Sequence, residues 1–321
     1  MSKIKHITLA PSALDRNGIS TTETLASARL DYLINGALAT GYDRNGIATS
    51  QAPTSAAAMT LDGATMGTPN LRTRKGVYIL IYAAGNDTGR TFTVVGEDGI
   101  GNVIREEITG PGVGLIVLGS TRFWKVTSVT PDAATAGNIE IGHNGYVDLS
   151  GAGAAQHVAI YSAGDDSAKT ITVTGENRYG DSLTESITGA NAGTSSSQAL
   201  NFGRVDRLTA SAGTAGATEA GVDGKCEAQW FVLNYRGGDF NVGLGVDVVS
   251  GTLTYAIQHT FQNVLASDYT EGDETVFTHD TLTGQTTDAD GNYTNPPAAI
   301  RLAFTAYTSG SAILHIVQGG S

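Results

Sequence analysis

The sequence predicts an all-β protein with an extended N-terminal arm, two tandem homologous small antiparallel β-sandwich domains and a C-terminal β-sandwich or jelly-roll domain. Three observations lead to this prediction. Glycine is abundant, with 42 among 321 residues, and only 16% of the residues are charged. Apolar and polar residues alternate in short runs that end in Gly, Asn or Asp, and one part of the chain repeats another. This composition fits strands joined by turns better than a helical bundle or a disordered chain.

The internal repeat defines the two central domains, which we expect at 76–150 and 151–224. A shift of 79 residues aligns about 78–142 with about 157–221 without a gap. In this alignment "TFTVVGE" meets "TITVTGE", and "EEITG" meets "ESITG". Because a single register holds over the whole stretch, we interpret the two parts as copies of one domain.

Each copy is predicted to contain about five to seven short antiparallel strands packed as a small sandwich. Phe92 and Val94 alternate with threonines in the first copy, and Ile171 and Val173 do so in the second. A period of two places the apolar residues on one face of a pleated strand. Each run then meets a Gly/Asn/Asp cluster and resumes, which predicts a hairpin.

The glycine-rich stretch "TVVGEDGIGNVIREEITGPG" (93–112) raises the question of a phosphate-binding loop. Such a loop requires a helix behind it, and a predicted strand follows here instead. The second copy also places the bulky Arg178 and Tyr179 within the loop. We therefore interpret the glycines as turn residues. Glycines are expected at strand ends at positions 96, 110, 175 and 189.

Residues 1–75 are predicted to form an extended arm with one short helix. The pentapeptide "DRNGI" occurs at 15–19 and 43–47, and its Asn-Gly pair predicts a tight turn each time. A helix is expected over 21–34. The rest of the arm has too little apolar surface for a core of its own, so we expect it to lie on the chain's own domains or on a neighbouring subunit.

Six apolar or alternating runs predict the C-terminal β-sandwich or jelly-roll at 225–321. The runs are "QWFVLNY", "FNVGLGVDVVS", "LTYAIQHTFQNV", "TVFTH", "AIRLAFTAYTS" and "AILHIVQGG". The predicted turns between them include "RGGD", "SDYTEGDE" and "TDADGNYTNPP".

Charge and apolar-run length exclude two classes of partner. The net charge of −12 argues against nucleic acid and against an anionic membrane surface. The longest apolar runs, such as 77–84, are far shorter than the roughly 18 residues that a membrane span requires. Proline and aspartate interrupt the first apolar stretch too early for a signal peptide. The single cysteine, Cys226, excludes an internal disulfide and fits a reducing cytoplasm.

No motif predicts catalysis, a cofactor or a metal. The six histidines lack paired metal spacing, and His259 and His315 are expected to be packed or hydrogen-bonded within apolar strands. No GxSxG motif is present. The sequence "DADGN" (288–292) resembles the start of a calcium loop, but Ala299 occupies the position of the required glutamate. We interpret it as a polar turn, with calcium binding as the alternative.

Glu106 and Glu185 occupy equivalent positions in the two copies. In each copy the residues two positions before and after the glutamate, which lie on the same strand face, are apolar. A catalytic acid with a raised pKa is one reading of such a carboxylate. We favour a β-bulge, an edge strand or an ion pair with the equally matched Arg90 and Lys169.

Tyr269 and Tyr293 are the candidate surface contacts. Both are predicted to lie in turns of the C-terminal domain, and acids flank both of them. These acids are Asp268 and Glu271, and Asp288 and Asp290. A tyrosine with flanking acids suits a glycan platform, but turn tyrosines are also favoured at protein interfaces. We favour lattice or subunit contact.

The pattern "AGNDTGRTFTVVGEDGIGNVIREEITGPG…FWKVTSV" resembles repeats found in virion proteins of tailed bacteriophages. The end, "NPPAAIRLAFTAYTSGSAILHIVQGG", is similar to the β-rich tails of such proteins. The resemblance covers about 75–142, 155–221 and 225–321. It implies a non-enzymatic protein that is present in many copies in the virion and is assembled in the host cytoplasm.

Within that resemblance, we expect a capsid decoration (cement) protein that contacts the major capsid protein or other virion proteins and associates with itself. The alternative is a tail, collar or fibre protein whose C-terminal sandwich binds a host glycan. A glycan-active enzyme is the least favoured class.

Overall fold

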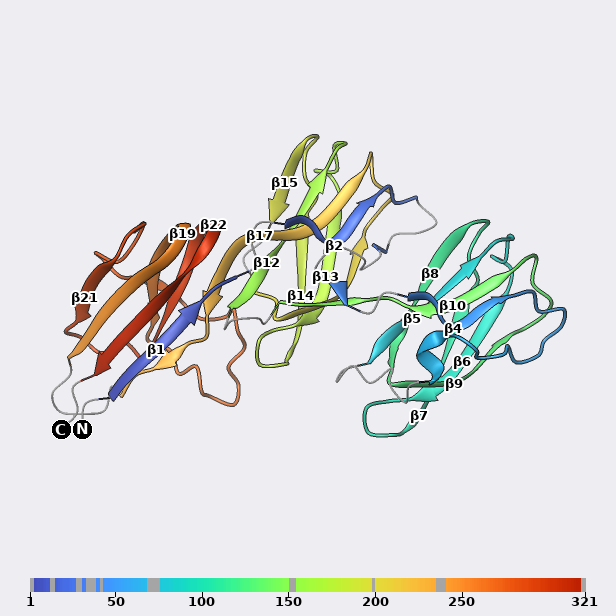
Figure 1. The fold of residues 1–321 in the computed structure, drawn as a ribbon, viewed down its shortest axis with the longest axis horizontal. Coiled ribbons are helices and arrows are strands. Elements are labelled where there is room, and N and C mark those ends of the chain that lie inside the picture. Colours follow the sequence, from blue (N-terminus) through green and yellow to red (C-terminus); the bar gives the residue numbers. More distant parts are fainter. Residues whose placement is uncertain are drawn as a thin grey trace.

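The computed structural model describes residues 3–11, 15–26, 31–32, 39–40, 43–67, 76–149, 154–197, 200–234 and 241–318. Nearly all elements in these ranges are β-strands, and the helical element among them is the short 3-10 turn η1 (Ala64–Gly67). The strands form several antiparallel sheets (Figure 1). The predicted all-β class is therefore confirmed.

Two sheets of the first repeat share one hydrophobic cluster. The four-stranded sheet has the order β4 (Asp43–Gln51), β10 (Ile139–His143), β5 (Val77–Ala83) and β8 (Leu115–Phe123). The three-stranded sheet has the order β7 (Val103–Thr109), β6 (Thr91–Glu97) and β9 (Lys125–Pro131). Apolar residues from both sheets, among them Ile79, Phe92 and Phe123, are fully buried together.

The second repeat pairs its strands in the same order. One set comprises β2 (Asp15–Glu23), β17 (Thr218–Ala228), β12 (Ala154–Ser162) and β15 (Thr194–Ser197). The other comprises β14 (Ser182–Thr188), β13 (Thr170–Glu176) and β16 (Arg204–Ala210), which β11 (Tyr146–Asp148) and β3 (Ala39–Thr40) extend. A second hydrophobic cluster, which includes Ile160, Val173 and Phe202, lies between them.

The register of pairing is also the same in both repeats. Thr91 pairs with Thr109 in the first, and Thr170 pairs with Thr188 in the second. The ladder to the third strand shifts at Gly96 in one and at Gly175 in the other. In these two ladders the registers and the position of the shift coincide at a constant offset of 79 residues, so the sequence repeat is matched by strand pairing there.

The glycine-rich stretch forms the β6–β7 hairpin, as predicted. Gly101 has a φ of 91° and its counterpart Gly180 has a φ of 92°, a region that favours glycine. The Asp98 carboxylate accepts hydrogen bonds from the amides of Ile100 and Asn102, both at 2.9 Å, and these bonds fix the turn. A strand follows the turn, so no helix N-terminus is available to bind a phosphate there.

The arm lies within the chain's own sheets. Its strand β1 (Lys3–Leu9) pairs with β22 (Ala299–Gln318), β2 pairs with β17, and β4 pairs with β10. Leu9, Ile19 and Ile47 of these strands are fully buried. The arm thus runs from β22 of the C-terminal part to the second repeat, where it supplies β2 and β3, and then to the first repeat, where it supplies β4 (Figure 1).

Two predictions for the arm are wrong. Both "DRNGI" segments lie in strands rather than in tight turns. Their Asn-Gly pairs fall in bulges, where five arm residues, Asp43 to Ile47, accompany only two residues of β10. The helix predicted over 21–34 is also wrong where the structure describes it, because Thr21–Glu23 belongs to β2 and Asp31 bridges to Thr209. Residues 27–30 and 33–34 lie outside the described residues.

The C-terminal part is built on one long ribbon. Predicted pairs of runs merge into β19 (Val242–Thr260) and β22, and the shorter strands β18 (Phe231–Val232), β20 (Phe277–Thr278) and β21 (Ala289–Tyr293) pair with this ribbon. The turn predicted at 288–292 is therefore wrong, since most of it is β21. The predicted "RGGD" turn lies outside the described residues.

The ribbon folds back on itself. Tyr293 pairs with Val242 at the start of β19, yet its hydroxyl lies 2.9 Å from Nδ1 of His259 near the end of the same strand. An extended strand would separate these two ends by about 55 Å, at roughly 3.3 Å per residue. Both halves accordingly contribute to one core, with Leu244 from the first and Ile257 from the second.

Candidate interaction surfaces

In the part of the chain that the structure describes, no group of three or more His, Cys, Asp or Glu side chains is arranged to hold a metal ion. The expectation for the two strand histidines is confirmed. His259 bonds to the Tyr293 hydroxyl, and Nε2 of His315 lies 2.8 Å from Asp247. Burial raises the pKa of the Cys226 thiol, so this residue is neutral and poorly nucleophilic.

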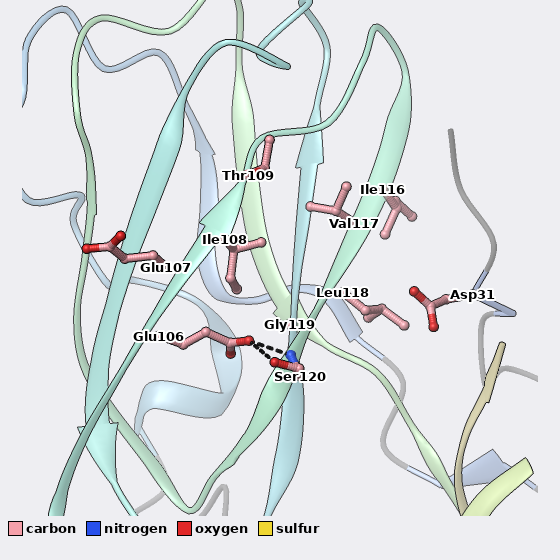
Figure 2. A pocket seen from close by; sticks show the side chains of 10 residues that line it. All are labelled: Asp31, Glu106, Glu107, Ile108, Thr109, Ile116, Val117, Leu118, Gly119 and Ser120. Atoms are coloured by element: carbon pink, nitrogen blue, oxygen red, sulfur yellow. Dashed lines mark hydrogen bonds between the residues drawn. The ribbon is translucent and has the colours of Figure 1, made fainter. Parts of the chain in front are cut away.

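Glu106 stabilises a bulge in β8 (Figure 2). Its carboxylate accepts hydrogen bonds from the backbone amide of Ser120 at 2.5 Å and from the Ser120 hydroxyl at 2.8 Å. Its counterpart Glu185 accepts a bond from the amide of Leu200 at 3.2 Å. Among the described strands β7 pairs with β6 alone, in a ladder without a register shift, so the edge-strand interpretation of Glu106 is confirmed and the bulge that it contacts lies in β8 rather than in its own strand.

The alternative partners of these acids are engaged elsewhere. Arg90 donates to the carbonyl of Ala134, and Lys169 pairs with Asp166 at 2.5 Å. The predicted ion pair between these cations and the two glutamates is wrong, because the glutamates lie within β7 and β14 while Arg90 and Lys169 lie just before β6 and β13 and bond to neighbouring loop groups.

A shallow groove of about 320 Å³ lies between β7 and β8. Figure 2 shows the apolar side chains of Ile108 and Val117 within it and Asp31 at one end. Asp31 pairs with Arg207 at 2.7 Å and Glu107 pairs with Arg105 at 2.6 Å, while Glu106 accepts hydrogen bonds from Ser120. The groove therefore offers apolar surface and strand backbone, and its three acids already have ion-pair or hydrogen-bond partners within the chain.

Charged side chains also join the two repeats. Arg122 of β8 contacts Asp206 of β16 at 2.5 Å and Glu176 at 3.2 Å. Arg204 also pairs with Asp206, and it donates to the carbonyl of Gly76 at 3.2 Å. Asp206 is almost fully buried, so this ion-pair network is held out of bulk water.

A second network joins the second repeat to the C-terminal part, and it contains Tyr269. The buried Arg301 pairs with Glu227 at 2.6 Å and with Glu274 at 3.4 Å. The Tyr269 hydroxyl donates to Glu274 at 3.0 Å, and burial together with the nearby Glu274 charge raises the Tyr269 pKa. Tyr269 is thus half-buried in an internal network, and its flanking acid Glu271 pairs with Arg178 at 3.3 Å.

The structure places Tyr293 in β21, so its predicted position in a turn is wrong. Its ring packs edge-on against His259 and His279, with centroids 5.1 and 4.8 Å away. Burial raises the pKa of Tyr293 and lowers the pKa of His259. The structure does not bring Tyr269 and Tyr293 together in one described contact.

Sequence reasoning missed a more exposed aromatic pair in the same region. Phe261 is 59% exposed and Phe277 is 46% exposed, and their ring centroids are 5.7 Å apart. Both contact the ring of His259. We call these two residues the Phe261–Phe277 patch. The signal available in the sequence was a phenylalanine at the end of one apolar run and another within the next.

The arm is anchored by matched arginines that sequence reasoning also missed. Arg44 lies 2.6 Å from Glu140 and stacks over the Tyr82 ring at 4.4 Å. Arg16 pairs with Glu219 and stacks over the Tyr161 ring at 3.5 Å. The repeated "DRNGI" carried this signal, because the arginine occupies the same place in both segments.

Among the described residues, no helix is long and apolar enough to span a bilayer. Comparisons of the chain with protein-family models and with curated proteins give no match.

Proposed function

We propose that this chain is a non-enzymatic structural protein of a tailed-bacteriophage virion, and specifically a capsid decoration (cement) protein. In this proposal two tandem homologous sandwich domains and a C-terminal sandwich form a linked row. The row contacts the major capsid protein, other virion proteins and further copies of itself. The protein is assembled in the host cytoplasm and acts in the particle without a cofactor.

The observation that carries the proposal is the arm, whose strands pair in turn with the C-terminal part (β1 with β22), the second repeat (β2 with β17) and the first repeat (β4 with β10). The pairing of β1 with β22 also places the N-terminal and C-terminal strands side by side in one sheet. A linked row of domains spreads contact area over several neighbours, and each bound domain raises the effective concentration of the next. The buried charges of the described residues also support a mechanical role, since those at the two junctions join one part of the chain to the next.

Imaging of labelled particles tests this proposal. Particles carrying the full-length chain with a gold-binding tag after Ser321 are examined by electron microscopy. We expect labels distributed over the head lattice. Labels confined to the neck, tail or fibres would overturn the decoration role.

Deletion of residues 1–40 does not separate a role of the arm in particle assembly from its role in folding. An arm without a core of its own predicts that a chain lacking 1–40 keeps folded domains and loses incorporation into particles. The deletion also removes β1 and β2 with the fully buried Ile19, so a folding defect is expected as well. Full-length variants are therefore preferred.

The alternative is a tail, collar or fibre protein with a C-terminal glycan site, and the Phe261–Phe277 patch favours it. Exposed aromatic rings stack on sugar faces, and Asp280 lies nearby in sequence. The test is the double variant Phe261→Ser/Phe277→Ser, with Leu265→Ser as control because Leu265 is 73% exposed. Lost host adsorption with an equally heat-stable head would favour the tail role. Reduced head stability with normal adsorption would favour decoration. Contact through Tyr269 and Tyr293 stays a prediction.

A further inference from the structure

The free edge of the first four-stranded sheet is apolar. This edge is β8, and its residues Leu115, Ile116, Val117 and Leu118 are each only partly buried. Val113, just before the strand, is 66% exposed. On one side β8 pairs with β5, and no described strand pairs with its other side. Such an edge is a template for another strand.

The second repeat provides an internal comparison. Its equivalent strand β15 (Thr194–Ser197) reads Thr-Ser-Ser-Ser where β8 reads Leu-Ile-Val-Leu. The edge strand β7 of the other sheet carries Arg105, Glu106 and Glu107. Polar and charged edges discourage pairing between molecules. The β8 edge lacks this protection although its duplicate has it, which points to a partner at β8.

Only the first half of β8 is available. The carbonyl of Gly119 accepts a hydrogen bond from Arg207 at 3.0 Å, and Arg122 pairs with Asp206. Figure 2 shows Asp31 beside Leu118 at this boundary, and Asp31 is itself paired with Arg207. The second repeat therefore covers the edge from about Gly119 onward, and no described strand covers Leu115–Leu118.

We propose that β8 pairs antiparallel with β8 of a second copy of this chain, so that two four-stranded sheets become one continuous sheet across a two-fold axis. A charge argument selects this occupant. The chain carries a net charge of −12, so most surfaces of two copies repel each other. Residues 113–121 contain no charged residue, so antiparallel self-pairing there sets no like charges opposite each other.

The side chains suit this pairing. Val117 packs against the core of the first repeat. Ile116 and Leu118 have the opposite strand parity and stand on the other face, where a paired strand brings their counterparts alongside. This inference deepens the self-association in the proposed function by naming the shared surface, and its test uses the purified chain, so it can fail separately from the virion role.

Analytical ultracentrifugation over a concentration series tests the proposal with Ile116→Lys/Leu118→Lys, which leaves Val117 in place. The matched control is Val249→Lys/Leu265→Lys, which adds the same charge at sites that are 58% and 73% exposed. We expect the wild type and the control to dimerise alike and the β8 variant to dimerise at least about tenfold more weakly. A second variant, Ile116→Ser/Leu118→Ser, copies the residues that the second repeat carries in the same strand. It keeps the test valid if the lysine variant fails to fold.

Hydrogen exchange identifies the interface. We expect the amides of 113–121 to gain protection as the wild-type concentration rises and to gain none in either β8 variant. A monomeric wild type, dimerisation of both β8 variants with unchanged affinity, or concentration-dependent protection elsewhere only would overturn the proposal. Protection of 113–121 that requires a different virion protein would also overturn it and would reassign the edge to that protein.

Discussion

Gly310 of β22 lies directly opposite Gly251 of β19, and both have a positive φ, 105° and 86°. A Cβ atom added to Gly310 would lie 1.9 Å from the carbonyl oxygen of Ser250. Register shifts flank this pair on β19. The two glycines therefore form the corner at which the long ribbon folds back, and that corner brings Tyr293 to His259.

Gly310→Ala is expected to destabilise the C-terminal part by at least about 2 kcal/mol, because strain at positive φ adds to overlap with backbone. Denaturant unfolding measures the loss. Gly243→Ala is the matched control in the same ribbon, where an added Cβ would meet nothing closer than 3.8 Å. Equal stability of the two variants would contradict a corner that requires glycine.

Ile47→Ala and Ile19→Ala are each expected to cost about 3 kcal/mol, since each leaves a cavity in a closed core. Ile47 belongs to the cluster of the first repeat and Ile19 to that of the second. Hydrogen exchange should show lost protection mainly in β10 and β5 for the first variant and in β17 and β12 for the second.

Arg44→Gln provides the comparison for the arm strands. The Arg44 side chain is 46% exposed, so solvent screens its ion pair and its removal should cost much less than that of Ile47. A larger loss for Arg44 than for Ile47 would show that charge, rather than burial, holds the arm.

Asp206→Ala should destabilise the chain more than Arg122→Ala. Asp206 is the shared acceptor for Arg122 and Arg204, so its loss leaves two cations facing each other in a buried site, at a cost of about 3–5 kcal/mol. Loss of Arg122 leaves Asp206 paired with Arg204. Thermal unfolding of the two variants gives the order, and the reverse order would mean that Arg122 acts mainly through its packing on Tyr78.

The buried His143 is expected to lower the stability of the folded protein at acidic pH. It is buried in β10, neither ring nitrogen has a hydrogen-bond partner among the described residues, and burial lowers its pKa below the usual 6.5. The unfolded chain therefore binds the proton more readily than the folded chain does. Stability from this group is complete above about pH 6.5 and falls as the pH drops below that value.

The variant His143→Val tests this directly, because the second repeat carries the buried Val222 at the equivalent position. Denaturant unfolding between pH 7.5 and pH 5 should show a smaller loss of stability in the variant than in the wild type. An unchanged pH dependence would assign the acid sensitivity to other groups.

Strand alternation and the internal repeat determined the β class, the equivalent strand pairing of the two repeated segments and the hairpin glycines. These features are local, since a hairpin such as β6–β7 joins residues that are close in sequence, and its turn requires a positive φ at Gly101. The edge-strand position of Glu106 was also accessible, because a carboxylate on an otherwise apolar strand face is typical of an edge strand.

Tertiary structure alone decided the partners of the arm, the corner of the C-terminal ribbon and the surroundings of the two tyrosines. Ser20 pairs with Ala220, and Tyr293 meets His259 only because Gly251 and Gly310 fold the ribbon. Backbone hydrogen bonds between distant strands use groups that every residue shares, so no residue type marks the partner in advance. The "DRNGI" segments illustrate the limit, because Asn-Gly favours a turn locally, whereas burial of Ile19 and Ile47 in the two cores holds the same segments in strands.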